Sequence, residues 1–382
     1  MSASDSKITV VPVQSRRQLR EFARFGRRLY KGCAYNVPEL DSDVMDLFTP
    51  SRNSALEFCQ AQTFLAVRGG RTVGRVAAII NAKANEAWGV KTVRFGWIDF
   101  EDDIEVSRAL LDTVAQWGLR RGMNRLEGPF GFTDFDPEGM LTWGFDRMGT
   151  MATIYNWPYY PEHMRRLGLT ESATWSEWLI PHSGIPEKIS RLSDIVLERN
   201  GLHVTDLSAA KSRLAVRYAH DIFHLVNESF SPLYGYSAFS EKQIDDFVRR
   251  YLPLIDKRLV CMVQDSEDNL VAAGFTIPSV AHALRKAGGH LFPLGWWHLL
   301  KAFRWKHSDT LEMLFMAVRP DYQNRGINAV PVARIMSAAL GMGFMQAESN
   351  PELDTNTKMQ SHWSYIEGTE IIKRRAVFYR EI

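Results

Sequence analysis

Hydrophobic and polar positions along the chain predict short strands and amphipathic helices in an order that occurs twice. In the first half, continuous apolar runs indicate buried strands, and apolar residues at helical spacing indicate helices. The strands are expected at residues 8–13, 63–67, 73–81, 93–100 and from 125 onward, and the helices at 15–30 and 105–121. The predicted order of this half is therefore β-α-β-β-β-α-β.

The second half has the same predicted order of elements, although no sequence identity between the two halves is visible. Its elements are expected at residues 202–207, 215–228, 259–264, 270–276, 311–318, 328–340 and 344–348. A strand at 174–180 and a helix at 185–199 flank the segment Pro181 to Gly184, whose proline and glycine favour a break. The pattern predicts an α/β protein with mixed sheets and two domains, residues 1–182 and 183–382.

Composition narrows the functional classes. Two domains fit 382 residues, and 45% hydrophobic with 24% charged residues is typical of a globular protein. A net charge of +2 does not favour a nucleic-acid partner. Three widely spaced cysteines predict neither a disulfide framework nor a metal knuckle, and the ten histidines show no metal-ligand motif such as HExxH. Because the start lacks a secretory signal and no apolar run could span a bilayer, we expect a cytoplasmic protein. Because the sequence shows no metal-ligand motif, we expect no bound metal.

The segment from Arg319 to Asn328 carries the strongest chemical signal. It connects a predicted strand to a predicted helix and contains Gly326, so backbone N–H groups and the positive end of the helix dipole would be presented together. Arg319 and Arg325 add two cations. This pattern indicates a site for a pyrophosphate, although Gly326 could also serve only a tight turn.

Gln323, Gly326 and Asn328 occupy the marked positions of the coenzyme A loop Q/R-x-x-G-x-G/A. With the order of elements around it, the chain resembles the GNAT acyltransferase superfamily; Asn328 departs from the Gly/Ala of the motif. The resemblance implies two tandem GNAT-like domains, of which the second binds acyl-CoA. The residues implied for the pyrophosphate are Arg319, Gln323, Asn324, Arg325, Gly326, Ile327 and Asn328. Those implied for the pantetheine arm are Leu314, Phe315, Met316, Ala317 and Val318, and Asn356 also belongs to the implied donor site.

Catalysis by such a domain would require an acceptor for the proton of the attacking amine. Glu312 and Glu348 are the carboxylate candidates, and His362 is a third. A tyrosine that protonates the leaving thiolate is implied by the resemblance, but Trp363 stands in its register. Tyr365 follows two residues later, about 200° around a helix.

The first half lacks the loop. Phe100 to Glu105 holds four carboxylates at the equivalent position, which would repel a pyrophosphate, so we expect a degenerate domain. The aromatic stretch from Gly128 to Tyr160 is expected either to form a core or to line an apolar wall for the acceptor. Gly74 to Ala77, Gly128-Pro129 and Gly144 to Asp146 resemble a bacterial group of tandem GNAT proteins.

Residues 281–309 exceed what the resemblance requires. Within them, residues 290–306 predict a cationic amphipathic helix with Trp296, Leu299, Leu300 and Phe303 on one face. Such a helix suits a bilayer interface or a lid over an acyl chain, or simple packing on its own domain.

The sequence therefore predicts an acyl-CoA-dependent N-acyltransferase acting on a small-molecule or lipid amine. Some bacterial ceramide synthases resemble GNAT proteins of this kind, which implies a sphingoid-type acceptor. The cationic amphipathic segment 290–306 separately predicts a peripheral contact with the inner face of the membrane. Two alternatives stay open. One is a Fem-like aminoacyl transferase, which would need a basic channel for tRNA, and the other is an inactive acyl-CoA-binding regulator.

Overall fold

The computed structural model describes residues 7–382 except 183–186, 209, 306–307, 357–359, 361–362 and 364–365. The chain divides into two compact units. Unit 1 comprises Met1–Ser176, Ala281–Leu300 and Ile372–Ile382, and unit 2 comprises Glu177–Val280 and Lys301–Ile371. Among the described residues, none of the helices combines the length and the apolar character needed to cross a bilayer.

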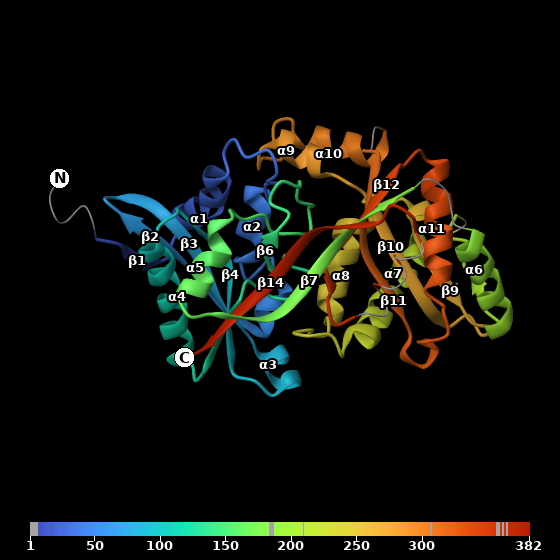
Figure 1. Ribbon diagram of the computed structural model, residues 1–382, viewed down its shortest axis with the longest axis horizontal. Coiled ribbons are helices and arrows are strands. Elements are labelled where there is room, and N and C mark those ends of the chain that lie inside the picture. Colours follow the sequence, from blue (N-terminus) through green and yellow to red (C-terminus); the bar gives the residue numbers. More distant parts are fainter. Residues whose placement is uncertain are drawn as a thin grey trace. The chain divides into compact units, whose positions relative to one another are not determined.

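Unit 1 is built on a mixed sheet covered by helices (Figure 1). Its helices are α1 (Arg16–Leu29), α2 (Asp41–Leu47), α3 (Ala82–Trp88), α4 (Ile104–Leu119), α5 (Tyr159–Arg166) and α9 (Ala281–Ala287), with a 3₁₀ turn at Ser54–Glu57. Its strands are β1 (Thr9–Pro12), β2 (Cys59–Arg68), β3 (Arg71–Asn81), β4 (Thr92–Phe100), β5 (Arg125–Gly128) and β6 (Met140–Trp143), with most of β14 (Glu370–Glu381) and the first residues of β7 (Thr170–Pro181). The strand order is β1-β2-β3-β4-β5-β14-β7, and β4 and β5 are parallel.

The core of unit 1 follows from the pattern of apolar positions. Helix α4 packs on β3 and β4 through Val106, Leu110 and Val114, which are fully buried against Val76 and Phe95. Helix α1 begins with a capping box, in which the Ser15 hydroxyl accepts the Gln18 N–H and the Gln18 side chain accepts the Ser15 N–H. Both predicted helices of this half are confirmed, with bounds shifted by one to two residues.

Unit 2 repeats the order of elements. Its helices are α6 (Glu187–Asn200), α7 (Ser212–Phe230), α8 (Glu241–Tyr251) and α11 (Ala329–Gly341), with 3₁₀ turns at Leu252–Leu254, Lys257–Leu259 and Pro320–Tyr322. Its strands are β8 (His203–Val204), β9 (Val260–Gln264), β10 (Leu270–Pro278), β11 (Thr310–Val318), β12 (Gln346–Ser349) and β13 (Glu352–Leu353). The last residues of β7 pair with β12, and the order is β7-β12-β11-β10-β9-β8 with β11 and β12 parallel. Helix α10 (Gly295–Arg304) begins in the segment assigned to unit 1 and ends in unit 2.

Helix α11 lies close to the sheet of unit 2 because one strand position lacks a side chain. A Cβ at Gly274 of β10 would lie 2.8 Å from Cβ of Pro331 and 3.0 Å from Cδ1 of Ile335. Both partners belong to α11, whose inner face also buries Val330 and Ala339 completely. The close approach packs the first turn of α11 against β10, and residues 319–328 connect that turn to the end of β11.

The two units differ from the predicted domains 1–182 and 183–382 in three segments, of which residues 177–182 belong to unit 2. Residues 372–382 belong to unit 1 because β14 pairs with β5, with Phe378 opposite Gly128. Residues 281–300 also belong to unit 1, where the Gly289 carbonyl accepts the Asp41 N–H at 2.9 Å. The predicted break at Pro181 to Gly184 falls partly outside the described residues, and the predicted strand 202–207 is reduced to His203–Val204.

Candidate functional site

The loop between β11 and α11 has the backbone that the sequence indicated for an anion site. Asn324 and Gly326 adopt positive φ angles of 66° and 76°, a backbone conformation that favours glycine and, among the other residues, asparagine. The Gln323 side chain donates to the Val318 carbonyl at 3.1 Å and holds the loop against the end of β11. Ile327 is 1% exposed and anchors the loop in the core. The loop is therefore an ordered turn at the N-terminus of α11, held by a side-chain hydrogen bond and a buried residue.

The two arginines of this loop have different surroundings. The Arg319 guanidinium donates two hydrogen bonds to the Asp321 carboxylate, at 2.8 and 3.0 Å, and lies 3.8 Å from Asp265. The same contact holds the pKa of the Asp321 carboxyl below its usual value. Arg325 is exposed, and its guanidinium carbon lies 4.8 Å from the centroid of the Tyr322 ring. Arg325 is thus the more accessible cation for a phosphate.

Beside the loop, β11 and β12 separate. The parallel pairing runs from Thr310 opposite Gln346 to Met313 opposite Ser349. Asn350 lies where the two strands separate, at a place that we call the fork. Its N–H donates to the Met313 carbonyl and its side chain donates to the Leu314 carbonyl, both at 3.0 Å. The edge of β11 from Leu314 to Val318 therefore extends past its pairing with β12, which is the segment that the sequence resemblance implied for the pantetheine arm.

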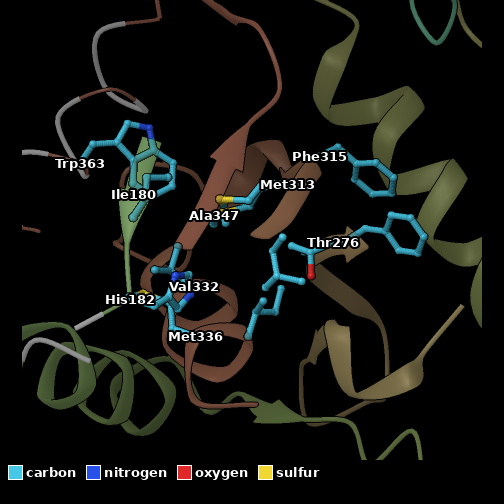
Figure 2. A pocket seen from close by; sticks show the side chains of 14 residues that line it. Ile180, His182, Thr276, Met313, Phe315, Val332, Met336, Ala347 and Trp363 are labelled. Atoms are coloured by element: carbon cyan, nitrogen blue, oxygen red, sulfur yellow. The ribbon is translucent and has the colours of Figure 1, made fainter. Parts of the chain in front are cut away.

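A narrow apolar pocket of about 20 Å³ lies under this fork. Its lining comes from β7, β10, β11, β12 and α11 together with Trp363, as Figure 2 shows. The lining residues are Ile180, His182, Gly274, Phe275, Thr276, Leu311, Met313, Phe315, Met316, Val332, Ile335, Met336, Ala347 and Trp363. Burial lowers the pKa of His182, so this imidazole is neutral at pH 7. The pocket is suited to aliphatic groups, with room for about one water molecule before any side chain moves.

Trp363 is buried at 1% exposure and donates its indole N–H to both carboxylate oxygens of Glu352 at 3.0 Å. Burial raises the pKa of Glu352 to about 7, although the indole donor opposes that rise. Sequence reasoning placed Trp363 in the register of the family's tyrosine but did not single out Glu352. A carboxylate just after the end of β12 was visible in the sequence, but its burial was not.

The structure brings Glu312 and Glu348 together. They are opposite each other in the register of β11 and β12, so both lie on the same face of the sheet. The pocket lies on the other face, which holds the alternate residues Leu311, Met313 and Ala347. Glu312 is 2% exposed and accepts a hydrogen bond from the Ser279 hydroxyl at 2.6 Å, whereas Glu348 is half-buried.

The other predicted site residues are only partly described. The Asn356 N–H donates to the Leu353 carbonyl at 2.9 Å and the residue is half-buried. His362 and Tyr365 lie outside the described residues.

In unit 1 the equivalent turn joins β4 to α4 and is occupied by its own carboxylates. Asp103 caps α4 by accepting the Glu105 N–H at 2.9 Å and pairs with Arg68. Glu101 pairs with Arg71, and Asp102 lies 3.2 Å from Nε2 of His163. The contact with Arg68 holds the pKa of Asp103 below its usual value. The place of an anion at this helix N-terminus is therefore filled by the protein itself.

Unit 1 also holds a pocket of about 110 Å³, with a buried polar network at its wall. Asp99 accepts hydrogen bonds from Arg75 at 2.7 Å, Tyr30 at 2.8 Å and Tyr160 at 3.1 Å. Tyr155 and Tyr160, from the aromatic stretch considered as an apolar wall, line this pocket. Other members of that stretch differ: Phe130 and Phe132 are buried and Trp143 is 53% exposed. No local sequence pattern indicated the Asp99 network, because its members come from four separate segments.

One histidine cluster was also missed. His220 and His224, one turn apart on α7, lie near Glu241 of α8 with ligand-type atoms within 4.8 Å of one another. His220 Nε2 is 3.2 Å from Asp245, and His224 Nε2 is 3.6 Å from Glu241. These side-chain contacts account for the cluster as a contact between α7 and α8.

Comparison with known proteins places this geometry in context. No protein-family model matches the chain. A protein of Caulobacter vibrioides named bacterial ceramide synthase is 26% identical over 375 residues, covering 96% of each chain. Protein YghO of Escherichia coli is 25% identical over 378 residues, covering 96% of this chain and 94% of its own. A solved tandem GNAT protein from the clavulanic acid biosynthesis pathway covers 98% of both chains at 11% identity, with a TM-score of 0.56.

The agreement over the whole chain confirms the predicted fold. Both halves and the order of their elements correspond to a tandem arrangement of GNAT-like domains.

Proposed function

Because the chain has the fold of the tandem GNAT proteins, we propose that it is an acyl-CoA-dependent N-acyltransferase. The observation that carries the proposal is the turn between β11 and α11. Its positive φ angles, its position at a helix N-terminus and the exposed Arg325 combine the three features that bind a phosphate.

The residues present fit such a donor. The described atom nearest to a Cβ built at Gly326 is Cγ2 of Val196, at 3.5 Å, so the backbone there is open to a close approach. Arg325 and the N–H groups of the loop would hold the pyrophosphate, with Gln323 fixing the loop and Arg319 becoming available only if it leaves Asp321. The edge from Leu314 to Val318 would pair with the pantetheine arm. Acyl-CoA, when bound, supplies the activated thioester.

Glu312 and Glu348 are the proposed proton acceptors. When a neutral amine forms an amide bond, one proton must leave the nitrogen, and a carboxylate near the fork can take it. The two glutamates are neighbours across β11 and β12, and Ser279 orients Glu312 by its hydrogen bond. His362 and Tyr365 stay predictions. Trp363 has no proton that it can give to a thiolate at neutral pH, so we propose that the thiolate leaves without a dedicated acid.

We infer that the acceptor is a lipid amine of the sphingoid type and that the product is a ceramide-like amide. The relative named bacterial ceramide synthase supports this because its similarity extends over both halves. The aliphatic pocket under the fork also suits a donor with an acyl chain, once its side chains move.

A thiol-release assay tests the proposal. The protein would be mixed with acetyl-CoA or palmitoyl-CoA and with either sphinganine or a soluble primary amine. We expect release with palmitoyl-CoA and sphinganine, and a loss of about 100-fold or more in kcat for Glu312→Gln. Glu187→Gln, at an exposed position on α6, is the matched control and should leave the rate unchanged.

The alternatives give different results. Binding of CoA without thiol release from any amine would indicate an inactive acyl-CoA-binding regulator. Transfer only from aminoacyl-tRNA would indicate a Fem-like aminoacyl transferase. Either result would overturn the proposal.

A further inference from the structure

Helix α10 and the turn before it expose an unusual group of large apolar side chains. Phe292 is 75% exposed, Leu294 63%, Trp296 43%, Trp297 43% and Trp305 64%. We call these five residues the α10 patch. They lie within fourteen consecutive positions, and the helix follows α9 at the segment coloured orange in Figure 1. Large apolar side chains exposed within so short a stretch of a folded chain mark a contact surface.

The patch differs from the apolar face expected from helical spacing. Of Trp296, Leu299, Leu300 and Phe303, only Trp296 is exposed, and the other three are half-buried. Leu299, Leu300 and Phe303 therefore serve to seat the helix on the protein. The exposed apolar residues are instead those at the start of the helix and just after its end, where aromatic side chains can project outward.

Acidic residues are missing from the sequence around the patch. Residues 269–308 contain no Asp or Glu, whereas an average stretch of 40 residues in this chain would hold about five. The same stretch contains five basic residues, Arg285, Lys286, Lys301, Arg304 and Lys306. Lys286 and Lys301 are exposed, and Lys306 lies outside the described residues. The sequence around the patch thus carries positive charge and no neighbouring acidic residue.

The turn that carries the patch is fixed by hydrogen bonds. The Trp296 N–H donates to the Leu291 carbonyl at 2.7 Å, and the Trp296 indole donates to the Pro293 carbonyl at 3.0 Å. Upstream, the Gly289 carbonyl accepts the Asp41 N–H at 2.9 Å. The indole of Trp296 is therefore held in place, and its exposure does not result from a loose end of the chain.

We propose that the α10 patch docks on the surface of an anionic lipid bilayer. Tryptophan and phenylalanine side chains enter the boundary between headgroups and acyl chains, while Lys286 and Lys301 approach lipid phosphates. Three indoles within a stretch of the sequence that has basic residues but no acidic ones match that boundary, where an amphipathic ring has both an apolar and a wet side. The contact is peripheral, since no described helix could cross the bilayer. The inference deepens the proposed function, because it gives the site access to long-chain substrates.

Co-sedimentation with vesicles tests the proposal on the full chain without any acyl-CoA. We expect the protein to bind vesicles of phosphatidylglycerol and phosphatidylcholine in equal parts at least tenfold more tightly than vesicles of phosphatidylcholine alone. The double substitution Phe292→Ser with Trp296→Ser should weaken that binding at least tenfold. Lys301→Glu should weaken it about fivefold or more, by replacing attraction with repulsion, and 0.5 M salt should reduce the difference between the two vesicle types.

Ile195→Ser provides the matched control, because Ile195 is 57% exposed on α6, away in sequence from the basic stretch, and should not affect vesicle binding. Thermal unfolding of each variant shows whether the fold is intact. If the double variant fails to fold, Lys301→Glu alone decides the matter. No binding of the parent protein to phosphatidylglycerol vesicles, or equal losses for Ile195→Ser, would overturn the proposal and leave a protein partner as the occupant.

The outcome is separable from that of the proposed function. Vesicle binding is measured without a donor, and titration of CoA is measured without vesicles. Vesicle binding with no affinity for CoA would overturn only the acyltransferase proposal. Affinity for CoA with no vesicle binding would sink only the membrane contact.

Discussion

The turns from β4 to α4 and from β11 to α11 occupy equivalent positions in the two units and have opposite chemistry. In unit 1, Asp103 caps the helix, and Glu101 and Asp103 are paired with Arg71 and Arg68. In unit 2, the turn has Asn324 and Gly326 at positive φ and leads into α11 without a side-chain cap at Asn328. One turn supplies its own anion, and the other is shaped to receive one.

The difference teaches how one fold can gain or lose a phosphate site with few changes. A helix N-terminus attracts negative charge wherever it occurs, because its first N–H groups lack partners within the helix. The Asp103 carboxylate already accepts one of these groups, the Glu105 N–H, and as part of the chain it is always present, so an outside phosphate would have to displace it. Asp103 therefore closes the site in unit 1 more completely than a simple lack of arginine would.

The largest effect is expected from Gly326→Glu. The new side chain would be strained at a φ of 76° and would place a carboxylate where a phosphate approaches. Like charges at close range cost about 4 kcal/mol near a protein surface, so affinity for CoA should fall by more than about 100-fold. Calorimetric titration measures the change. Gly326→Asn, which tolerates positive φ and adds no charge, should lose far less affinity. An unchanged affinity of the glutamate variant would refute the assignment of the turn.

A second prediction compares two carboxylates with opposite pKa shifts. Burial raises the pKa of Glu352 to about 7, so between its usual value of 4.5 and 7 the folded state holds a proton that the unfolded state releases. The free energy of unfolding should therefore fall as pH rises through this window, by up to about 3 kcal/mol from this group. Glu352→Gln, which can still accept the Trp363 indole, should remove that fall.

Denaturant unfolding at pH 5 and pH 8 provides the measurement. The variant should gain stability relative to the parent at pH 8 and little at pH 5. For Asp103 the sign is reversed: its lowered pKa contributes stability above its usual value of 3.8, and that stability is lost as the pH falls below it. Equal pH dependence of the parent and Glu352→Gln would contradict the buried state of Glu352.

The third prediction concerns the closed turn. Asp103→Ala removes the cap of α4 and the partner of Arg68, and the free energy of unfolding should drop by about 1–2 kcal/mol. Affinity for CoA should stay as in the parent, because the donor turn is in unit 2. Ser15→Ala, which removes the cap of α1, serves as a comparison of similar size. A loss of CoA affinity in Asp103→Ala would mean that the roles of the two turns are reversed.

The smallest effect is expected from Asp321→Asn. This change weakens the contact that holds Arg319 and removes a negative charge from the donor turn. Affinity for CoA should rise two- to fivefold, which corresponds to about 0.5–1 kcal/mol for an exposed pair. Competition titration at two salt concentrations resolves the change. A fall in affinity would show that Asp321 positions Arg319 for the phosphate.

Much of the fold followed from local patterns. Helix α4 ends at Leu119 where Gly122 predicted a stop, and β3 and β4 were recognised from continuous apolar runs. Strand β14 was missed although it holds buried Phe378, because its alternation includes the buried charges Lys373 and Arg375. The same limit applies to the site. The turn at Gly326 was recognisable from glycine, arginine and their flanking elements, but the burial of Glu352 was not.

By itself, the sequence determined the order of elements, the two-part plan and the contrast between an acidic turn at Glu101–Asp103 and a basic one at Arg319–Arg325. Those properties depend on residues close together in the chain, where periodicity, turn chemistry and charge act locally. Only the tertiary structure decided that Arg319 is held by Asp321 and Asp265, that Glu312 lies beside Glu348, and that Trp363 donates to Glu352. It also decided which apolar residues of α10 stay exposed. Register between strands and burial depend on contacts between distant segments, and a periodic pattern fixes which face a residue occupies but not what that face meets.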